Sequence, residues 1–228
     1  MKALVMAPLQ EELDFLLAHW GEQGYRSLPA VIGLLPVTEV PDLSLSIALG
    51  GVGKAQFAVH TRHILDHCSP VDLVICAGAA GALTDLVAVG DVVIATQTIE
   101  HDYGNRFTDR PKPVFTAAPI ALARLRAASA GRRVHFGPIA SGDEDVIDIE
   151  RRDGLHRSTR ALAVAWEGAG GARACALSGI PFVEIRGITD NANPAAPTEF
   201  ALNLETALRN VAAVISSMLI QSGATQEN

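Results

Sequence analysis

Short apolar segments alternate with amphipathic segments along the whole chain. The apolar segments are rich in Val and Ile, and polar or turn-forming residues bound them, so each is predicted to be a β-strand. Several are almost continuously apolar, which is typical of strands that are covered on both faces. The predicted strands are Ala3–Ala7, Leu43–Leu49, Leu73–Ala77, Val92–Thr96, Val134–Ile139, Leu162–Trp166 and Phe182–Ile188.

The amphipathic segments between them predict helices. The longest, Phe200–Ser222, carries Phe200, Leu204 and Leu208 at helical spacing. The other predicted helices are Leu9–His19, Ala55–His67, Ile120–Ala128 and Gly168–Leu177. Alternating strands and helices indicate an α/β fold with a central sheet. Because no repeat or low-complexity linker interrupts the pattern, residues 1–228 are predicted to form a single domain.

Composition and charge exclude several classes of protein. Of the 228 residues, 49% are hydrophobic and 19% are charged, which excludes a disordered chain. The net charge of −7 and the scattered Lys and Arg residues argue against binding to nucleic acid or to an anionic membrane. Val211–Ile220 is an apolar stretch of about half of the roughly 20 residues that cross a bilayer, so no membrane span is expected.

The cysteine and histidine residues do not form a metal-binding pattern. Cys68, Cys76 and Cys175 are odd in number and far apart, which excludes a disulfide framework and a zinc knuckle and favours a reducing, cytoplasmic location. A group of histidines shares one face of a predicted helix, but no Cys or suitably spaced Glu accompanies it. A solvated helix face is therefore favoured over a metal site. The histidines concerned are His60, His63 and His67.

Two glycine-rich loops are predicted after strands, at Gly50–Gly53 and Gly78–Gly81. Glycine lets a backbone approach a ligand closely, yet neither loop fits a nucleotide motif. Ala55 stands where a Walker A loop has Ser or Thr, and Gly78–Gly81 lacks the Gly-x-Gly-x-x-Gly spacing of dinucleotide folds. Taken alone, each loop is best explained as an ordinary turn.

Three carboxylates, Glu12, Glu167 and Asp190, each follow a predicted strand. Open α/β sheets bind ligands outside the carboxyl ends of their strands, so the fold can gather these acids at one edge for acid/base chemistry. Simpler explanations stay open for two of them. Glu12 suits the first turn of a helix, and Asp190 suits the cap of a turn. Glu167 lies between an apolar strand and a Gly-rich helix, where a charge is costly unless something binds it.

The order of motifs resembles the purine nucleosidases of the nucleoside phosphorylase superfamily, of which the 5′-methylthioadenosine/S-adenosylhomocysteine nucleosidases are typical. The resemblance covers most of the chain and implies a three-layer α/β sandwich with a central mixed β-sheet, without metal or cofactor. The matching segments are Lys2–Glu12, Gly50–Ala55, Cys76–Ala82, Val89–Ile94, Ser141–Asp143, Ala163–Glu167 and Pro181–Asp190.

The resemblance implies hydrolysis of the bond between ribose and a purine through an oxocarbenium-like transition state. Glu12 matches the general base that activates water, and Asp190 matches the acid that protonates N7 of the departing purine. Glu167 matches the acceptor of the ribose hydroxyl groups. The remaining candidates for substrate binding are Trp166, Gly78, Ala79, Val146 and Asp145.

Water is predicted as the nucleophile because Pro8–Glu12 lacks the arginine with which phosphorylases bind phosphate. Two positions depart from the family. Asp145 stands where an aromatic residue stacks on the purine, and Trp166 replaces a methionine. Adenine release is expected, since Asp190 can accept from an amino group. The alternatives are a futalosine hydrolase that releases hypoxanthine, a purine nucleoside phosphorylase and a member that binds a nucleoside without cutting it.

A loop at residues 100–107 lies where the family closes the pocket of the neighbouring subunit. Tyr103 and Phe107 give it two aromatic side chains in a chain that is only 5% aromatic. The resemblance therefore implies a homodimer that binds a small nucleoside.

Overall fold

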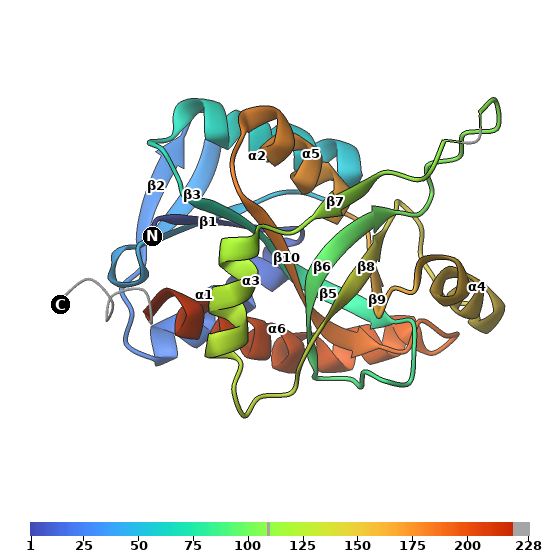
Figure 1. Cartoon of the computed structure of the whole chain (residues 1–228). Helices are drawn as coiled ribbons and strands as arrows, with labels where there is room; N and C mark the ends of the chain where they lie inside the picture. Colours follow the sequence, from blue (N-terminus) through green and yellow to red (C-terminus); the bar gives the residue numbers. More distant parts are fainter. Residues whose placement is uncertain (109, 221–228) are drawn as a thin grey trace.

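The computed structural model describes residues 1–108 and 110–220 and shows a mixed ten-stranded sheet between two layers of helices (Figure 1). The strands are β1 Ala3–Ala7, β2 Leu28–Ile32, β3 Leu35–Val40, β4 Leu45–Leu49, β5 Leu73–Ala82, β6 Val92–Glu100, β7 Val114–Thr116, β8 Val134–Ser141, β9 Ala163–Ala165 and β10 Phe182–Asp190. The helices are α1 Gln10–Glu22, α2 Gly53–His67, α3 Pro119–Ala128, α4 Ile149–Thr159, α5 Gly168–Ser178 and α6 Ala196–Ile220, with a 3₁₀ turn at Pro41–Leu43. The predicted three-layer α/β class is confirmed.

The helices divide between the two faces of the sheet. α1, α3 and α6 cover one face, and α2 and α5 pack together on the other (Figure 1). Each face has its own apolar core: Trp20, Leu208 and Ile215 belong to the first, and Phe57 and Ile64 to the second. The strands whose sequences are almost continuously apolar are those that have a layer of helices on each face. No helix in the described chain is long and apolar enough to cross a membrane.

Half of the sheet closes on itself. β5 pairs with β10, β10 with β6, β6 with β8, β8 with β9, and β9 again with β5. The other half is open, in the order β5-β1-β4-β3-β2. Because β1, β5 and β10 run parallel, their carboxyl ends meet at the mouth of this ring. That arrangement brings together the residues that follow β1 and the end of β10. The turn after β9 joins them because β9 pairs antiparallel with Gly81 and Ala82 at the end of β5.

The loop predicted at Gly78–Gly81 is wrong, because β5 continues through these residues to Ala82. Gly78 pairs with Arg186 of β10, and Gly81 lies in the same ladder as Asp190. A Cβ on Gly78 would come within 2.7 Å of Arg186 Nη1, and one on Gly81 within 2.8 Å of Asp190 Oδ1. The glycines therefore make room for charged side chains and do not turn the chain.

Other differences concern elements without a clear pattern of buried positions. The β2–β3 hairpin, β7 and the polar helix α4 were not predicted, and β2 and β7 bury none of their residues fully. The predicted helix boundaries otherwise agree with α1, α2, α3, α5 and α6 to within a few residues. Residues 221 and 222 of the last predicted helix lie outside the described residues, as does the end of the predicted 1–228 domain.

Candidate active site

A cavity of about 540 Å³ opens where β1, β5, β9 and β10 end. Its wall contains seven of the eight residues predicted for the site; Gly78 is not among the lining residues and lies beneath Glu12 and Arg186. The charged side chains of the wall are five carboxylates and one guanidinium: Glu12, Glu144, Asp145, Glu167, Asp190 and Arg186. The fold thus brings the three predicted acids to a single cavity.

Glu12 lies in the first turn of α1 and is 2% exposed. Its Oε1 accepts a hydrogen bond from the backbone N–H of Ala79 at 2.7 Å, and its Oε2 accepts from that of Leu9 at 2.9 Å. Burial raises its pKa from 4.5 to about 7, although nearby Arg186 and the Ala79 N–H oppose the rise. A carboxyl with this pKa can take up a proton at neutral pH. Its place in the first turn of α1 is thus compatible with the predicted role as a base.

Glu167 directly precedes α5 and is 5% exposed. Its Oε1 accepts from the backbone N–H of Gly53, the first residue of α2, at 3.2 Å. Its Oε2 accepts from Arg186 Nη2 at 3.0 Å. Two elements on opposite sides hold this carboxylate in the wall, where it can accept hydrogen bonds from a ligand.

Asp190 ends β10 and is 8% exposed. Its Oδ1 accepts from the backbone N–H of Ala192 at 2.9 Å, and its Oδ2 accepts from the Thr189 hydroxyl at 2.8 Å. Burial raises its pKa, while both hydrogen bonds work against the rise. Asp190 does cap the following turn, and it also faces the cavity as a carboxyl that holds a proton more readily than an exposed aspartate.

Arg186 is the functional side chain that we did not predict from the sequence. It is 1% exposed and is the only Lys or Arg that is fully buried in the described chain. Its Nε donates to Glu184 Oε1 at 2.8 Å, and its Nη1 donates to the carbonyl of Ala79 at 3.3 Å. The sequence does contain a signal for this residue: Glu184 and Arg186 occupy alternate positions of an apolar strand. Charges in such a strand are buried only when they are paired, so the two residues indicate a buried ion pair.

The rest of the wall comes from the turns after β8 and β9. Trp166 is half-buried there, so an indole ring borders the cavity beside Glu167. Its carbonyl accepts from the Ser141 hydroxyl at 2.8 Å, and the same hydroxyl accepts from the N–H of Ala169 at 2.9 Å. Val146 is buried in the wall and Asp145 is exposed at it. The structure thus places the indole of Trp166 and the carboxylate of Asp145 along the same cavity.

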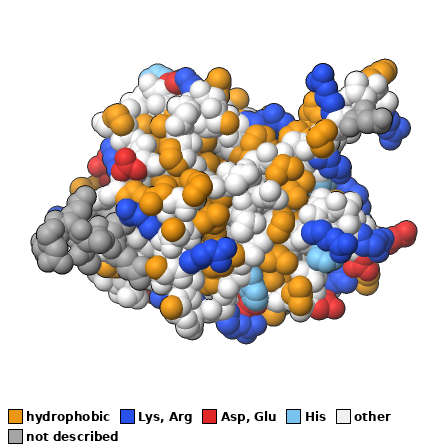
Figure 2. Space-filling model, in the orientation of Figure 1, with side chains coloured by type: hydrophobic (Ala, Val, Ile, Leu, Met, Phe, Trp, Pro, Cys, Tyr) orange, Lys and Arg blue, Asp and Glu red, His pale blue; other side chains and the backbone are white. Residues whose placement is uncertain are grey.

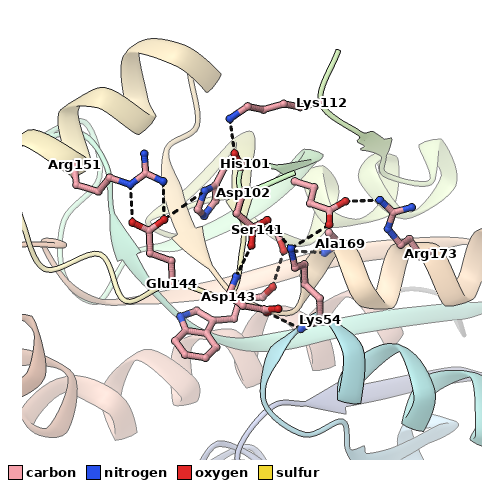
Figure 3. A network of polar contacts seen from close by, with 12 residues as sticks. Lys54, His101, Asp102, Lys112, Ser141, Asp143, Glu144, Arg151, Ala169 and Arg173 are labelled. Atoms are coloured by element: carbon pink, nitrogen blue, oxygen red, sulfur yellow. Dashed lines mark hydrogen bonds and ion pairs between the residues drawn. The ribbon is translucent and has the colours of Figure 1, made fainter. Parts of the chain in front are cut away.

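A polar network fixes these turns relative to α2 (Figure 3). The Lys54 ammonium contacts Glu100 at 3.1 Å and Asp102 at 2.5 Å, while the Lys54 backbone N–H donates to Asp143 Oδ1 at 2.8 Å. The Asp143 N–H donates in turn to Asp102 Oδ2 at 3.0 Å, and Arg173 of α5 pairs with Glu100. The ends of β6 and β8 and the starts of α2 and α5 are therefore joined, which holds Gly53 in place for Glu167.

The three histidines of α2 contact the backbone of the protein. His63 Nε2 accepts from the N–H of Leu34, and ring nitrogens of His60 and His67 lie within hydrogen-bond distance of the carbonyls of Leu49 and His63. Within residues 1–108 and 110–220, no group of three or more His, Cys, Asp or Glu side chains could hold a metal ion.

Comparisons with known proteins point to one family. Residues 2–220 match the model of the phosphorylase superfamily. The chain is 30% identical to a 5′-methylthioadenosine/S-adenosylhomocysteine nucleosidase of Geobacillus thermodenitrificans, over 99% of this chain and all of that protein. The nucleosidase of Neisseria meningitidis, solved with methylthio-immucillin-A, superimposes with a TM-score of 0.83 at 28% identity and covers 97% of this chain and 99% of that one. A futalosine hydrolase of Helicobacter pylori shares the fold, with a TM-score of 0.85 at 24% identity over 97% of this chain and 98% of its own.

Proposed function

The chain belongs to the phosphorylase superfamily, and we propose that it is a purine nucleosidase that hydrolyses the bond between a purine and its ribose. The observation that carries the proposal is the pair of buried carboxyls, Glu12 and Asp190, in one cavity wall, each with a raised pKa. One of them can accept a proton near neutral pH, and the other can donate one. Cleavage of an N-glycosidic bond requires both actions.

In the proposed reaction each acid has its own step. Glu12 draws a proton from water as the water attacks C1′ of the sugar, and Asp190 gives a proton or a hydrogen bond to N7 of the purine, so that the base leaves uncharged. Glu167, which Gly53 and Arg186 hold from two sides, accepts from the ribose hydroxyl groups. The oxocarbenium-like transition state is cationic, and the carboxylates around it lower its energy.

The charges of the cavity favour water over phosphate as the nucleophile. Arg186 is the only cation among the described lining residues, and two carboxylates, Glu167 and Glu184, already compensate its charge. The backbone N–H of Ala79 donates to Glu12 and that of Gly53 to Glu167, so the protein's own carboxylates take these donors. A phosphate dianion in this cavity would meet no unpaired cation among the described lining residues.

The substrate we propose is a 5′-methylthioadenosine- or S-adenosylhomocysteine-type nucleoside, with adenine as the released base. Relatives that are 30% and 32% identical to the chain, over 99% and 80% of its length, carry that activity in their names. The wall suits a purine, because Trp166 and Val146 offer apolar surface near Asp190. No metal or cofactor enters the proposed reaction.

We also propose a homodimer that works in the cytoplasm. The chain between β6 and β7 projects from the body of the molecule as an arm (Figures 1 and 2), on which Phe107 is fully exposed and Tyr103 is 48% exposed. Exposed aromatic side chains are typical of surfaces that a partner covers.

Cys68, Cys76 and Cys175 are free thiols, as a reducing compartment such as the cytoplasm keeps them. Sedimentation and cell fractionation test the two proposals.

The decisive experiment is base release, resolved by chromatography, with and without phosphate. The panel consists of 5′-methylthioadenosine, S-adenosylhomocysteine, adenosine, inosine and futalosine. Adenine released without phosphate supports the proposal. Hypoxanthine from futalosine would support a futalosine hydrolase, a need for phosphate would indicate a phosphorylase, and tight binding without release would indicate a binding protein.

Two variants connect the activity to the site. Asp190→Asn and Glu12→Gln are each expected to lose turnover while the protein stays folded. Glu11→Gln, on the exposed side of the same helical turn as Glu12, is the matched control and should keep full activity. Normal rates from either site variant would refute the assigned roles.

A further inference from the structure

Glu184 is a fully buried carboxylate that cannot touch a substrate. It lies in the middle of β10, is 0% exposed and is not part of the cavity wall. Its Oε1 accepts from Arg186 Nε at 2.8 Å, and its Oε2 accepts from the Thr98 hydroxyl at 2.7 Å. A buried charge is costly, and any role of Glu184 in the reaction must pass through the groups that it contacts.

Glu184 lies against two groups next to Glu167, the Arg186 guanidinium and Gly168. Arg186, which it binds through Nε, turns its Nη2 to Glu167. On the other side lies the start of α5: a Cβ on Gly168 would come within 2.1 Å of Glu184 Oε2, so only glycine lets the helix begin this close to the carboxylate. Gly168 directly follows Glu167 in the chain. One side chain therefore supports the guanidinium that binds Glu167 and the first residue of the helix behind it.

The charges form a compact buried group. Arg186 lies between Glu184, away from the cavity, and Glu167, in the cavity wall, with ion-pair distances of 2.8 and 3.0 Å. Its remaining partners are neutral: the Cys76 thiol and the carbonyl of Ala79, both at 3.3 Å. Without Glu184, the guanidinium would keep a single anionic partner and lose the hydrogen bond that fixes its Nε.

We propose that Glu184 is a positioning residue of the active site, which holds the Arg186 guanidinium against Glu167 and compensates its charge from behind the cavity. The proposal rests on the nucleosidase function proposed above. According to the proposal, Glu184 affects ribose binding through Glu167. It also affects the pKa of the general base, Glu12, through the electrostatic field of Arg186.

The second effect has a defined sign. Arg186 lowers the pKa of Glu12, while burial and Glu167 raise it, and the backbone N–H groups of Ala79 and Leu9 lower it. The neutral thiol of Cys76 faces the same group. Removal of the negative charge of Glu184 leaves Glu167 as the only anion paired with Arg186, so the positive field of Arg186 at Glu12 increases and the pKa of Glu12 is expected to fall.

The test is Glu184→Gln, which keeps the size of the side chain and an acceptor for Arg186 Nε and removes the charge. The amide NH2 can donate to the Thr98 hydroxyl, which then accepts where it donated before. We expect the acidic limb of the kcat/KM profile, which reports Glu12 in the free enzyme, to move by about one pH unit toward lower pH.

Glu184→Asp keeps the charge but is one methylene too short to reach its partners. For this variant we expect kcat/KM to fall about tenfold, mainly through KM, with the limb unmoved.

Glu205→Gln is the matched control, because Glu205 is an exposed carboxylate of α6 that pairs with Arg209 and should change neither quantity. In Glu184→Gln, a lower rate at every pH with the limb in place would indicate a purely structural role and would overturn the proposal. Normal KM and kcat/KM in Glu184→Asp would also overturn it, and this second variant decides the question if Glu184→Gln does not fold.

Failure of the proposed function would be recognised separately. If the wild-type protein releases no base from any nucleoside, the nucleosidase assignment is wrong. The ¹³C shift of the Glu12 carboxyl, followed against pH by NMR in wild type and Glu184→Gln, then tests the charge effect without turnover. A titration midpoint that is lower in the variant supports the proposal, and equal midpoints overturn it.

Discussion

The substitution Glu12→Gln should stabilise the protein relative to wild type as the pH rises. Glu12 is buried, and its pKa is raised from 4.5 to about 7. The folded protein therefore prefers the protonated carboxyl. The protonated carboxyl contributes fully to the free energy of unfolding below about pH 4.5. This contribution is lost as the pH rises through about 7, because the buried carboxyl then ionises without water around its charge. Glutamine is neutral at every pH and avoids this loss.

The magnitude follows from the two pKa values. Each pH unit of difference between the folded and unfolded pKa corresponds to about 1.4 kcal/mol, so full ionisation of Glu12 costs the folded state roughly 3 kcal/mol. Between pH 5 and pH 8, the difference in unfolding free energy between Glu12→Gln and wild type should change by about 2 to 3 kcal/mol in favour of the variant. Glutamine cannot accept both backbone N–H groups that Glu12 accepts, but this penalty does not depend on pH.

The assay is urea denaturation at pH 5, 6, 7 and 8, at one protein concentration, for wild type, Glu12→Gln and Glu11→Gln. Glu11 occupies the neighbouring position in α1 and is exposed, so its substitution should leave the pH dependence of wild type unchanged. All other titrating groups are common to the three proteins and cancel in the differences. A difference between Glu12→Gln and wild type that stays constant from pH 5 to pH 8 would refute a raised pKa at Glu12 and, with it, the explanation of how this carboxyl acts as a base.

Three further outcomes are expected. Gly81→Ala should lower kcat about tenfold or more, because its Cβ would lie 2.8 Å from Asp190 Oδ1 and must displace that carboxyl, whereas Gly21→Ala, with no atom within 4 Å, should leave kcat unchanged. Adenosine 5′-monophosphate should be cleaved at least about tenfold more slowly than adenosine, because Arg186, the only cation among the described lining residues, is already paired with Glu167 and Glu184; equal rates would contradict this account of the charges. Phe107→Asp should shift sedimentation from dimer to monomer, and a monomeric wild type would refute the homodimer.

The gathering of the acids could be predicted from the sequence because position along a parallel sheet decides it. Glu12 follows β1 and Asp190 ends β10, and these parallel strands bring their carboxyl ends to one edge whatever the intervening loops do. Glu167 reaches the same place differently, because the short strand β9 pairs antiparallel with the end of β5. The strands themselves were recognisable because layers of helices cover both of their faces. A polar residue that follows such a run has few places to lie other than the mouth of the sheet.

The role of the glycines and of Arg186 depends on register, which a sequence does not reveal. Gly78 looks like part of a turn until β5 and β10 are paired, and only then does it stand opposite Arg186. Arg186 likewise looks like an isolated charge in an apolar strand. One of its partners, Glu184, lies two positions before it. The others, Glu167 and Ala79, lie far away in the chain. Contacts between residues this far apart in the chain can be identified only when the pairing and register of the strands are known.

The different partners of the three acids account for the different roles proposed for them. Glu12 accepts only from backbone N–H groups and keeps Arg186 at a distance, so burial dominates and its carboxyl can exchange a proton. Asp190 has a hydroxyl and one N–H, and burial dominates there too. Glu167 alone touches the guanidinium, a contact that fixes a carboxylate as an acceptor. In the proposed reaction, the same carboxyl group serves as a base, an acid and a binding group, and the three differ in the groups that each one contacts.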